Sequence, residues 1–181
     1  LGKRVSVLSP DPLPRYLGFL VGEPYLTEPP MRANYICVDV AESSLLGGLC
    51  GLLEGKILLK LDHHYSGKDY ALYNYTDPGA AAAGEVIAEL AELMELSSPS
   101  ISRALYCAIA SDTGCFRFAN TTARTLRLAA DFYDDGIDVR ELNVALFESR
   151  PPKTAKAMAL GIENTTFYLD GRVAVCFISK E

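Results

Sequence analysis

A short apolar run that ends in one acid and two imidazoles constrains this chain more than any other feature. The run covers residues 56–61, and Asp62, His63 and His64 follow it directly. These two histidines are the only ones in the protein. Such a run predicts a buried β-strand, and histidine beside carboxylate is a common ligand set for ions such as Mn²⁺ or Zn²⁺. The sequence therefore predicts a site where this strand ends, although a polar turn that closes a strand gives the same pattern.

The order of the expected elements predicts an α/β fold with a mostly parallel sheet flanked by helices. Strands are expected at residues 4–9, 35–40 and 56–61, with a possible short strand at 72–75. A helix at residues 44–53 separates the second strand from the third, and this alternation favours parallel pairing. The second strand is apolar on both faces, as is typical of strands covered by helices on both sides. Further helices are expected at residues 80–96, 101–110, 122–133 and 139–149.

The chain is expected to hold one domain and the beginning of another. Residues 1–150 form the first domain, and Pro151-Pro152 marks its end. Residues 151–181 are expected to contain a linker helix at 153–163 and the first strands of a second domain. These strands form a hairpin around Asp170-Gly171, a common turn sequence. The first residue is not methionine, and we interpret the chain as part of a longer one.

Composition excludes several classes of protein. The formal net charge is −6, which excludes a diffuse basic surface that holds long nucleic acids by counterion release. No apolar stretch approaches the roughly 18 to 20 residues of a membrane span, and no secretory signal pattern is present. The five cysteines show no C-x-x-C spacing, and at least three lie in apolar runs. Cysteines of this kind are typical of buried small hydrophobes in a reducing compartment, so we expect a cytoplasmic protein.

Two further acids occur in apolar surroundings. Asp39 lies within Ile36-Cys-Val-Asp-Val40, and Asp112 follows an apolar helix and precedes Thr113-Gly114. A buried carboxylate is costly unless it is paired, protonated or bound to a metal. Ligands of open α/β sheets gather beyond the carboxyl ends of the strands, where Asp39 and Asp62 would both project. A helix cap or a turn explains each acid alone, but together with the histidines they predict a shared site.

The sequence leaves some roles within this site open. Neighbouring side chains of a strand point to opposite faces, so a continuing strand would prevent His63 and His64 from binding one ion in the same way. We expect one of them to bind metal and the other to contact a substrate phosphate or a supporting acid. Arg117 lies between two phenylalanines, where it could bind a phosphate while a ring stacks on a base. An exposed arginine on an alternating strand is the other interpretation.

Three segments, in this order and at this spacing, resemble the DHH phosphoesterase superfamily. They are Asp39 ahead of a glycine-rich segment, Asp62-His63-His64 after the next strand, and Ser111-Asp-Thr-Gly-Cys-Phe-Arg-Phe-Ala-Asn-Thr-Thr122. The resemblance covers about residues 2–150. The last segment is most similar to the branch of oligoribonucleases (nanoRNases) and 3′-phosphoadenosine 5′-phosphate phosphatases. That branch implies an enzyme that releases 5′-mononucleotides from very short RNAs and converts 3′-phosphoadenosine 5′-phosphate to AMP.

The resemblance also implies roles for individual residues. Asp39 would bridge two Mn²⁺ ions, and His63 and Asp112 would be further metal ligands. Mg²⁺ or Co²⁺ are expected as possible substitutes for Mn²⁺. Two residues are implied in catalysis, since Asp62 would orient the site and His64 would face the scissile phosphate. Two such ions lower the pKa of a bound water and neutralise charge on the phosphate, which defines two-metal hydrolysis.

The implied substrate is a short single-stranded RNA or a nucleotide. It would be bound by a monomer or a homodimer and contacted by Arg117, Asn120 and Thr121.

Two parts of the family pattern have no match here: the first motif, H-x-x-x-D-x-D, and the C-terminal G-G-G-H segment. We therefore expect the full-length protein to be an enzyme, and these 181 residues to bind metal weakly and turn over little. Two alternatives remain. The substrate could be a cyclic or linear dinucleotide, a polyphosphate or pyrophosphate, or the domain could bind nucleotides without catalysis.

Overall fold

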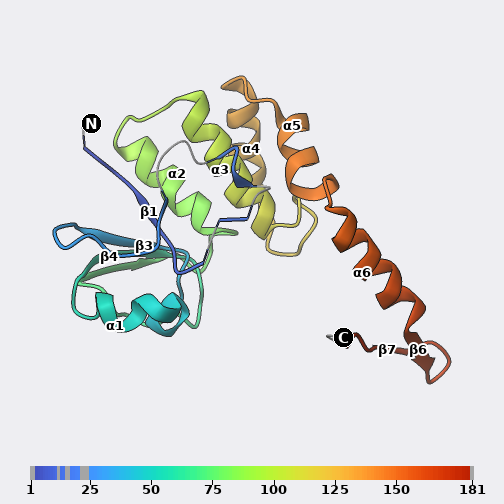
Figure 1. Cartoon of the computed structure of the whole chain (residues 1–181). Helices are drawn as coiled ribbons and strands as arrows, with labels where there is room; N and C mark the ends of the chain where they lie inside the picture. Colours follow the sequence, from blue (N-terminus) through green and yellow to red (C-terminus); the bar gives the residue numbers. More distant parts are fainter. Residues whose placement is uncertain (1–2, 12, 15–16, 21–24, 180–181) are drawn as a thin grey trace. The chain divides into compact units, whose positions relative to one another are not determined.

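A computed structural model describes residues 3–11, 13–14, 17–20 and 25–179 (Figure 1). The chain divides into two compact units, Leu1–Leu146 and Phe147–Glu181. The first unit contains a parallel sheet and helices, and the second contains a helix and an antiparallel hairpin. The predicted α/β fold with a parallel sheet is confirmed.

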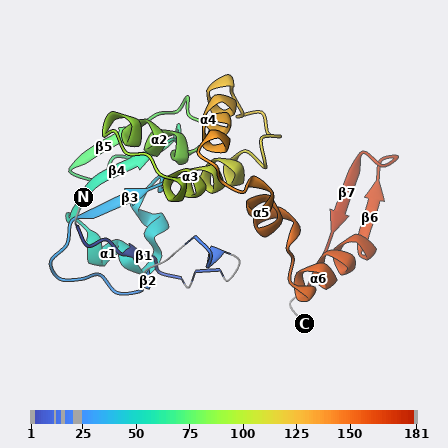
Figure 2. The ribbon, with the colours of Figure 1, turned by 90° about the horizontal axis from the view of Figure 1, so that it is seen from above.

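The sheet that carries the expected site has three parallel strands in the order β3-β4-β5. A second sheet consists of two short parallel strands, β1 and β2 (Figure 2), and Leu8 of β1 packs against the core cluster that contains Cys37 of β3. The strands are β1 (Val7–Leu8), β2 (Tyr25–Leu26), β3 (Tyr35–Val38), β4 (Ile57–Asp62) and β5 (Tyr73–Thr76). The strand expected at residues 4–9 is shorter than predicted, because only two of its residues pair with β2 and Val5 is largely exposed.

The central strand β4 is buried because it has a neighbouring strand on each side and side chains packed on both faces. One cluster joins Cys37 of β3 and Ile57 of β4 to leucines of the segment that contains α1. The other joins Leu61 of β4 to Ala80 and to Val86 of α2. Figure 1 shows α1 on one side of the sheet and α2 and α3 on the other. This packing fixes where β4 ends and therefore where the residues after it lie.

The helices of the first unit follow the predicted pattern with two local differences. Their bounds are α1 (Cys50–Leu53), α2 (Ala83–Leu93), α3 (Pro99–Asp112), α4 (Ala123–Asp134) and α5 (Val139–Asn143). The helix expected at residues 44–53 is mostly a 3₁₀ helix, kinked at Gly47, whose φ of 56° no regular helix adopts. The helix expected at residues 139–149 changes to a π-helix at Val144–Glu148.

Strand β3 differs from the prediction in its burial. Ile36 and Val38 are 57% and 44% exposed, although the sequence predicted a strand covered on both faces. The reason is its place at an end of the sheet, since among the described residues β3 pairs only with β4. One face and one edge of β3 therefore stay open to solvent.

The second unit contains the linker helix and the hairpin that the sequence predicted. Helix α6 (Pro152–Glu163) leads to the antiparallel strands β6 (Thr165–Tyr168) and β7 (Val173–Cys176). Asp170 and Gly171 lie in the turn with φ of 54° and 80°. Within the described part of the chain, no helix has the length and apolar character needed to cross a membrane.

Candidate functional site

Three side chains from distant parts of the sequence meet at the carboxyl end of the sheet. Asp39 directly follows β3, His63 directly follows β4, and Asp112 is the last residue of α3. The Nε2 atom of His63 lies 3.4 Å from Asp39 Oδ1 and 3.4 Å from Asp112 Oδ2. The structure thus brings together the three residues that the sequence placed in one site. Parallel strands end at the same edge of a sheet, which explains why Asp39 and His63 are neighbours.

The orientation of His63 leaves one ring nitrogen available to the acids. Its Nδ1 atom lies 3.2 Å from the backbone oxygen of Ala80, which can only accept a hydrogen bond. We therefore assign the ring proton to Nδ1, so Nε2 carries the lone pair and faces Asp39 and Asp112. This arrangement, with a backbone carbonyl behind the ring, is typical of histidines that bind metal.

The neighbouring His64 is held by a buried carboxylate. Asp62 has no exposed surface, and its Oδ1 atom accepts hydrogen bonds from His64 Nδ1 at 2.7 Å and from the backbone N–H groups of His63 and His64. The hydrogen bond to Asp62 raises the pKa of His64 above its ordinary value. Burial acts to raise the pKa of Asp62, but these hydrogen bonds outweigh it and lower that pKa. The Nε2 atom of His64 is the nitrogen left for a ligand.

The prediction that His63 and His64 point to opposite faces is conditional on a continuing strand, and the strand does not continue. Strand β4 ends at Asp62, and the two rings lie with their centroids 4.6 Å apart. His64 Nδ1 is also 3.7 Å from Asp39 Oδ1. Both imidazoles therefore lie at the same site, with different hydrogen-bond partners.

The acids of the site repel one another. Burial and then the charge of Asp39 raise the pKa of Asp112, while the two histidines act to lower it. Asp39 also has a φ of 61°, a conformation uncommon for a residue other than glycine and often found at functional sites. Ligand atoms of Asp39, His63 and His64 all lie within 4.8 Å of one another. Carboxylate and imidazole donors without a thiolate fit a divalent cation such as Mn²⁺, which would relieve this repulsion.

The acids open onto a small cavity of about 260 Å³. Asp39 and Asp112 lie on its wall, and apolar residues of β3, α2 and α3 form much of the rest, among them Val38, Ile87 and Leu105. A ligand in this cavity would contact the acids at one end and apolar side chains elsewhere. The two acids thus face a cavity, while His63 and His64 are not among the residues that line it.

The three residues implied in substrate binding lie in the segment after α3. This segment is a turn, so the interpretation of Arg117 as part of an alternating strand is wrong. Arg117 is exposed, and its Nε donates to Gly114 O at 2.6 Å. The Asn120 amide donates to the backbone oxygens of Ala81 and Asp112, at 2.9 and 3.2 Å, and so ties the end of α3 to the segment before α2. Thr121 Oγ1 is buried without a hydrogen-bond partner in the described part of the chain. Their contact with substrate stays a prediction.

Sequence reasoning missed Lys60, which has no exposed surface. Its Nζ atom donates to Lys68 O at 3.0 Å and lies 3.7 Å from Asp62 Oδ2. A lysine inside an apolar run was the available indication, because a central parallel strand is buried on both faces and such a charge needs a partner.

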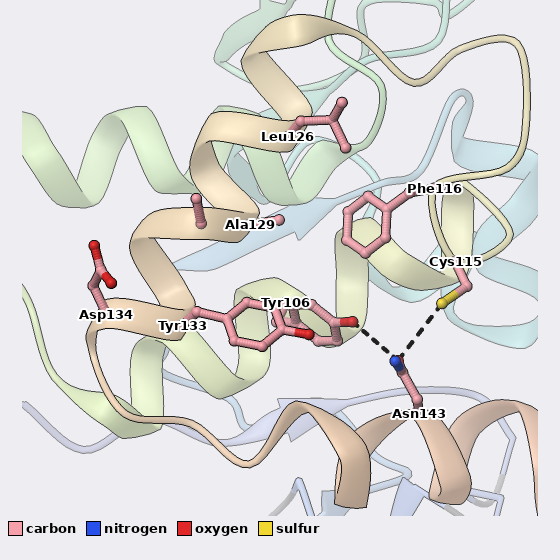
Figure 3. Close-up of a pocket in the computed structure, with 9 residues that line it drawn as sticks. Tyr106, Cys115, Phe116, Leu126, Ala129, Tyr133, Asp134 and Asn143 are labelled. Atoms are coloured by element: carbon pink, nitrogen blue, oxygen red, sulfur yellow. Dashed lines mark hydrogen bonds between the residues drawn. The ribbon is translucent and has the colours of Figure 1, made fainter.

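A larger cavity, of about 510 Å³, lies between α3, α4 and α5 (Figure 3). Aromatic rings of Tyr106, Phe116 and Tyr133 form part of its wall. Asn143 Oδ1 accepts hydrogen bonds from the Tyr106 hydroxyl at 3.0 Å and from Cys115 Sγ at 3.7 Å, which Figure 3 shows as dashed lines. This cavity shares no lining residue with the acids and histidines of the candidate site.

Comparisons with curated proteins find similarity along the whole chain. The chain is 30% identical over 186 residues to the bifunctional oligoribonuclease and PAP phosphatase NrnA of Thermus thermophilus, covering 100% of this chain and 56% of that protein. It is 32% identical over 129 residues to the probable bifunctional oligoribonuclease and PAP phosphatase NrnA of Streptococcus mutans, covering 71% of this chain and 41% of that protein. The chain thus spans about half the length of the curated relatives it matches. No protein-family model matches the sequence.

Solved structures share the fold. An exopolyphosphatase-related protein from Bacteroides fragilis superposes with a TM-score of 0.82 at 18% identity, over 92% of this chain and 54% of that one. This likeness shows the fold alone. A putative family II inorganic pyrophosphatase from Methanococcus jannaschii gives a TM-score of 0.55 at 29% identity, over 72% of this chain and 47% of that one.

Proposed function

This chain belongs to the NrnA family of DHH phosphoesterases, and on that premise we propose that the protein is a metal-dependent phosphoesterase. It releases 5′-mononucleotides from short oligoribonucleotides and removes the 3′-phosphate of 3′-phosphoadenosine 5′-phosphate. The observation that carries this proposal is the meeting of Asp39, His63 and Asp112 at 3.4 Å contacts on His63 Nε2. Three donors from three separate elements, on a chain related along its whole length to NrnA, support a metal-assisted hydrolysis.

In this proposal Asp39, His63 and Asp112 hold Mn²⁺. The metal supplies an activated water and neutralises charge on the phosphate. Asp62 fixes His64 with the proton on Nδ1, as the 2.7 Å hydrogen bond requires if the carboxylate is ionised. The hydrogen bond to Asp62 raises the pKa of His64 and so favours its imidazolium form, relative to a free imidazole. The Nε2–H of this form would donate to a phosphate oxygen.

The charge of the chain supports a short substrate. A net charge of −6 gives no broad attraction for a long polyanion, so attraction must come from the metal and from placed cations. Arg117 is exposed close to the end of α3 and has guanidinium N–H groups beyond the one that contacts Gly114. We assign it to the substrate phosphate or base, with Asn120 and Thr121 in the same segment. A cytoplasmic location and a homodimer stay predictions.

The test is hydrolysis in the presence of Mn²⁺. The 181-residue chain and the longest reading frame that contains it are assayed on RNAs of two to five nucleotides, on a 24-nucleotide RNA and on 3′-phosphoadenosine 5′-phosphate. We expect the longer protein to cleave the short RNAs and the nucleotide and to leave the long RNA largely intact. We expect the 181 residues to bind Mn²⁺ weakly and turn over little. The proposal would be overturned if the longer protein hydrolysed none of these substrates with any of the metals tested.

Pyrophosphate is a second candidate substrate, since the chain is 29% identical to the putative pyrophosphatase of Methanococcus jannaschii over 72% of its length. Adding pyrophosphate to the same panel separates the two. A kcat/KM for pyrophosphate above that for short RNA would favour this alternative.

A further inference from the structure

Lys60 and Asp62 form a buried pair directly behind the candidate site. They lie two residues apart on β4, so their side chains project from the same face of the strand. Both have no exposed surface. A buried ammonium group is costly unless it is paired and hydrogen-bonded, so its surroundings show what retains it.

Three groups surround the Lys60 ammonium. It donates to the backbone oxygen of Lys68 at 3.0 Å, lies 3.7 Å from Asp62 Oδ2, and lies 5.7 Å from the centre of the Tyr70 ring. Lys68 and Tyr70 belong to the segment that follows the two histidines. Tyr70 in turn donates its hydroxyl to Val40 O at 2.9 Å, next to Asp39. Lys60 therefore lies against Asp62 at the base of the site and against the segment that follows the two histidines.

The two oxygens of Asp62 have different surroundings. Oδ1 accepts the side-chain hydrogen bond of His64 and both backbone N–H groups after the strand. Oδ2 has no hydrogen-bond partner among the described residues, and Lys60 Nζ is the cation that faces it. The ammonium group thus offsets the charge of the carboxylate from the side away from His64.

We propose that Lys60 is a positioning residue for the reaction: its buried ammonium group holds Asp62 with Oδ1 turned to His64 and so fixes the ring that faces the substrate. This proposal rests on the proposed function only for the role of His64 in hydrolysis. The arrangement of Lys60, Asp62 and His64 is testable without any activity.

The test replaces the charge and keeps the length of the side chain, in Lys60→Met. Lys56→Met is the matched control, since Lys56 is exposed just before β4 and its Nζ donates to the backbone oxygen of Leu52, away from Asp62. The first readout is amide hydrogen exchange by NMR at His63 and His64, whose N–H groups bind Asp62 Oδ1. We expect both amides to exchange at least about tenfold faster in Lys60→Met, with the α3 amides unchanged and the control like the native protein.

The second readout is hydrolysis of a short RNA by the longer protein. We expect Lys60→Met to lower kcat by about tenfold to 100-fold with little change in KM, because a misplaced His64 affects the chemical step. If the native protein shows no hydrolysis, the proposed function is wrong. The exchange measurement still tests whether Lys60 positions Asp62 and His64. Exchange at His63 and His64 in Lys60→Met equal to that in Lys56→Met would overturn the positioning role.

A double variant keeps the proposal testable if Lys60→Met does not fold. Lys60→Met with Asp62→Asn removes both charges, and we expect it to fold and to match Asp62→Asn alone in exchange and kcat. Two outcomes would show that Lys60 does not act through Asp62 and would overturn the proposal. In the first, Asp62→Asn folds but the double variant does not. In the second, Lys60→Met lowers kcat a further tenfold when it is added to Asp62→Asn.

Discussion

At the scale of single residues, the site combines groups that stabilise one another with groups that do not. Asp62 and His64 form a favourable pair, whereas Asp112 is raised in pKa by burial and by the charge of Asp39. An acid whose pKa is raised in the folded state destabilises the fold above its unfolded pKa. In the absence of metal, Asp112 therefore costs stability at neutral pH. The chain keeps this acid although the negative charge of Asp39 repels it.

We predict that Asp112→Asn stabilises the metal-free protein and weakens metal binding. Removing a charge near Asp39 should add about 0.5 kcal/mol, a value typical of partly exposed charges, and raise the Tm by about 1–2 °C. Affinity for Mn²⁺ should fall at least about tenfold, because a ligand is lost. Differential scanning fluorimetry and calorimetric titration measure the two effects. Asp131→Asn, an exposed acid on α4, controls for net charge, and a lower Tm in Asp112→Asn than in this control would contradict the prediction.

The Asp62–His64 pair predicts a pH dependence of stability in the metal-free protein. The pKa of His64 is raised, so its contribution is complete below about pH 6.5, its unfolded value, and is lost as pH rises through the folded pKa. The pKa of Asp62 is lowered, so its contribution is present above about pH 4 and is lost as pH falls through the folded pKa.

His64→Gln tests this window. We expect the Tm difference between native and variant protein to be largest between about pH 4 and pH 6.5, and to shrink on either side. Measurements at several pH values in the presence of a chelator check it. A difference that does not vary from pH 5 to pH 9 would show that the pair contributes nothing through its charges.

Sequence reasoning found the site residues that lie at the ends of strands or helices. It missed Lys60, which lies inside strand β4. A cap or a turn explains Asp39, His63 or Asp112 alone, and they were predictable only together, from the shared edge at which parallel strands end and from the resemblance of the three segments to one superfamily. The apolar run around Lys60 indicated that its charge would need a partner, but the sequence alone did not identify that partner. The contact between Lys60 and Asp62 depends on which face of β4 is covered, and only the packing decides that.

At the scale of elements, α4 is attached to α2 through a buried hydrogen bond. Thr122 caps α4 and forms a reciprocal capping box with Thr125. Thr125 Oγ1 also contacts Glu85 Oε1 at 2.5 Å, and both side chains are fully buried. The sequence predicted the cap, because Thr-Thr before a helix is a common start. It did not predict the link to Glu85, which is forty residues earlier.

We predict that Thr125→Val destabilises the protein by about 2–3 kcal/mol, because it removes the cap partner and leaves the Glu85 carboxylate buried without its hydroxyl. Urea denaturation measures the loss. Ser98→Ala, which removes the cap of α3 alone, should cost about 1 kcal/mol. Adding Glu85→Gln should recover part of the Thr125→Val loss, and equal costs for Thr125→Val and Ser98→Ala would show that Glu85 does not depend on Thr125.

The helices that differed from prediction did so for two different reasons. Residues 43–53 contain the only bend that a glycine with positive φ imposes inside a helix of the described chain, and periodicity does not reveal such a bend. Helix α5 continues as a π-helix at Val144–Glu148, and the apolar residues of this segment did not reveal the change to i→i+5 hydrogen bonds. Apolar spacing predicts where a helix lies but not which hydrogen-bond pattern it uses.

At the scale of the whole molecule, the second unit buries little of its apolar surface within itself. Phe167, Val175, Phe177 and Ile178 are 67%, 50%, 76% and 57% exposed, and Gly161 is the buried residue among those described for α6. A hairpin on a single helix is marginally stable without further packing. The sequence predicted these elements correctly but could not show that their apolar side chains lack a core.

We predict that the two units differ in hydrogen exchange. Amides of β6 and β7 should exchange at least about 100-fold faster than those of β4, the ratio that corresponds to roughly 3 kcal/mol in opening free energy. Exchange followed by NMR or mass spectrometry on the 181-residue chain checks this. Equal protection of β4 and β7 would show that the hairpin has a stability that its exposed side chains do not explain.

Among the described strands, β3 stands at one end of this sheet and β5 at the other, and each pairs with β4 alone. A further strand running in the same direction beside β3 would stop level with Asp39, within reach of the acids. The same addition beside β5 would stop level with Thr76, one strand farther from them. A strand added on the β3 side would therefore bring the residues that follow it next to Asp39, while β3, β4 and β5 keep their register.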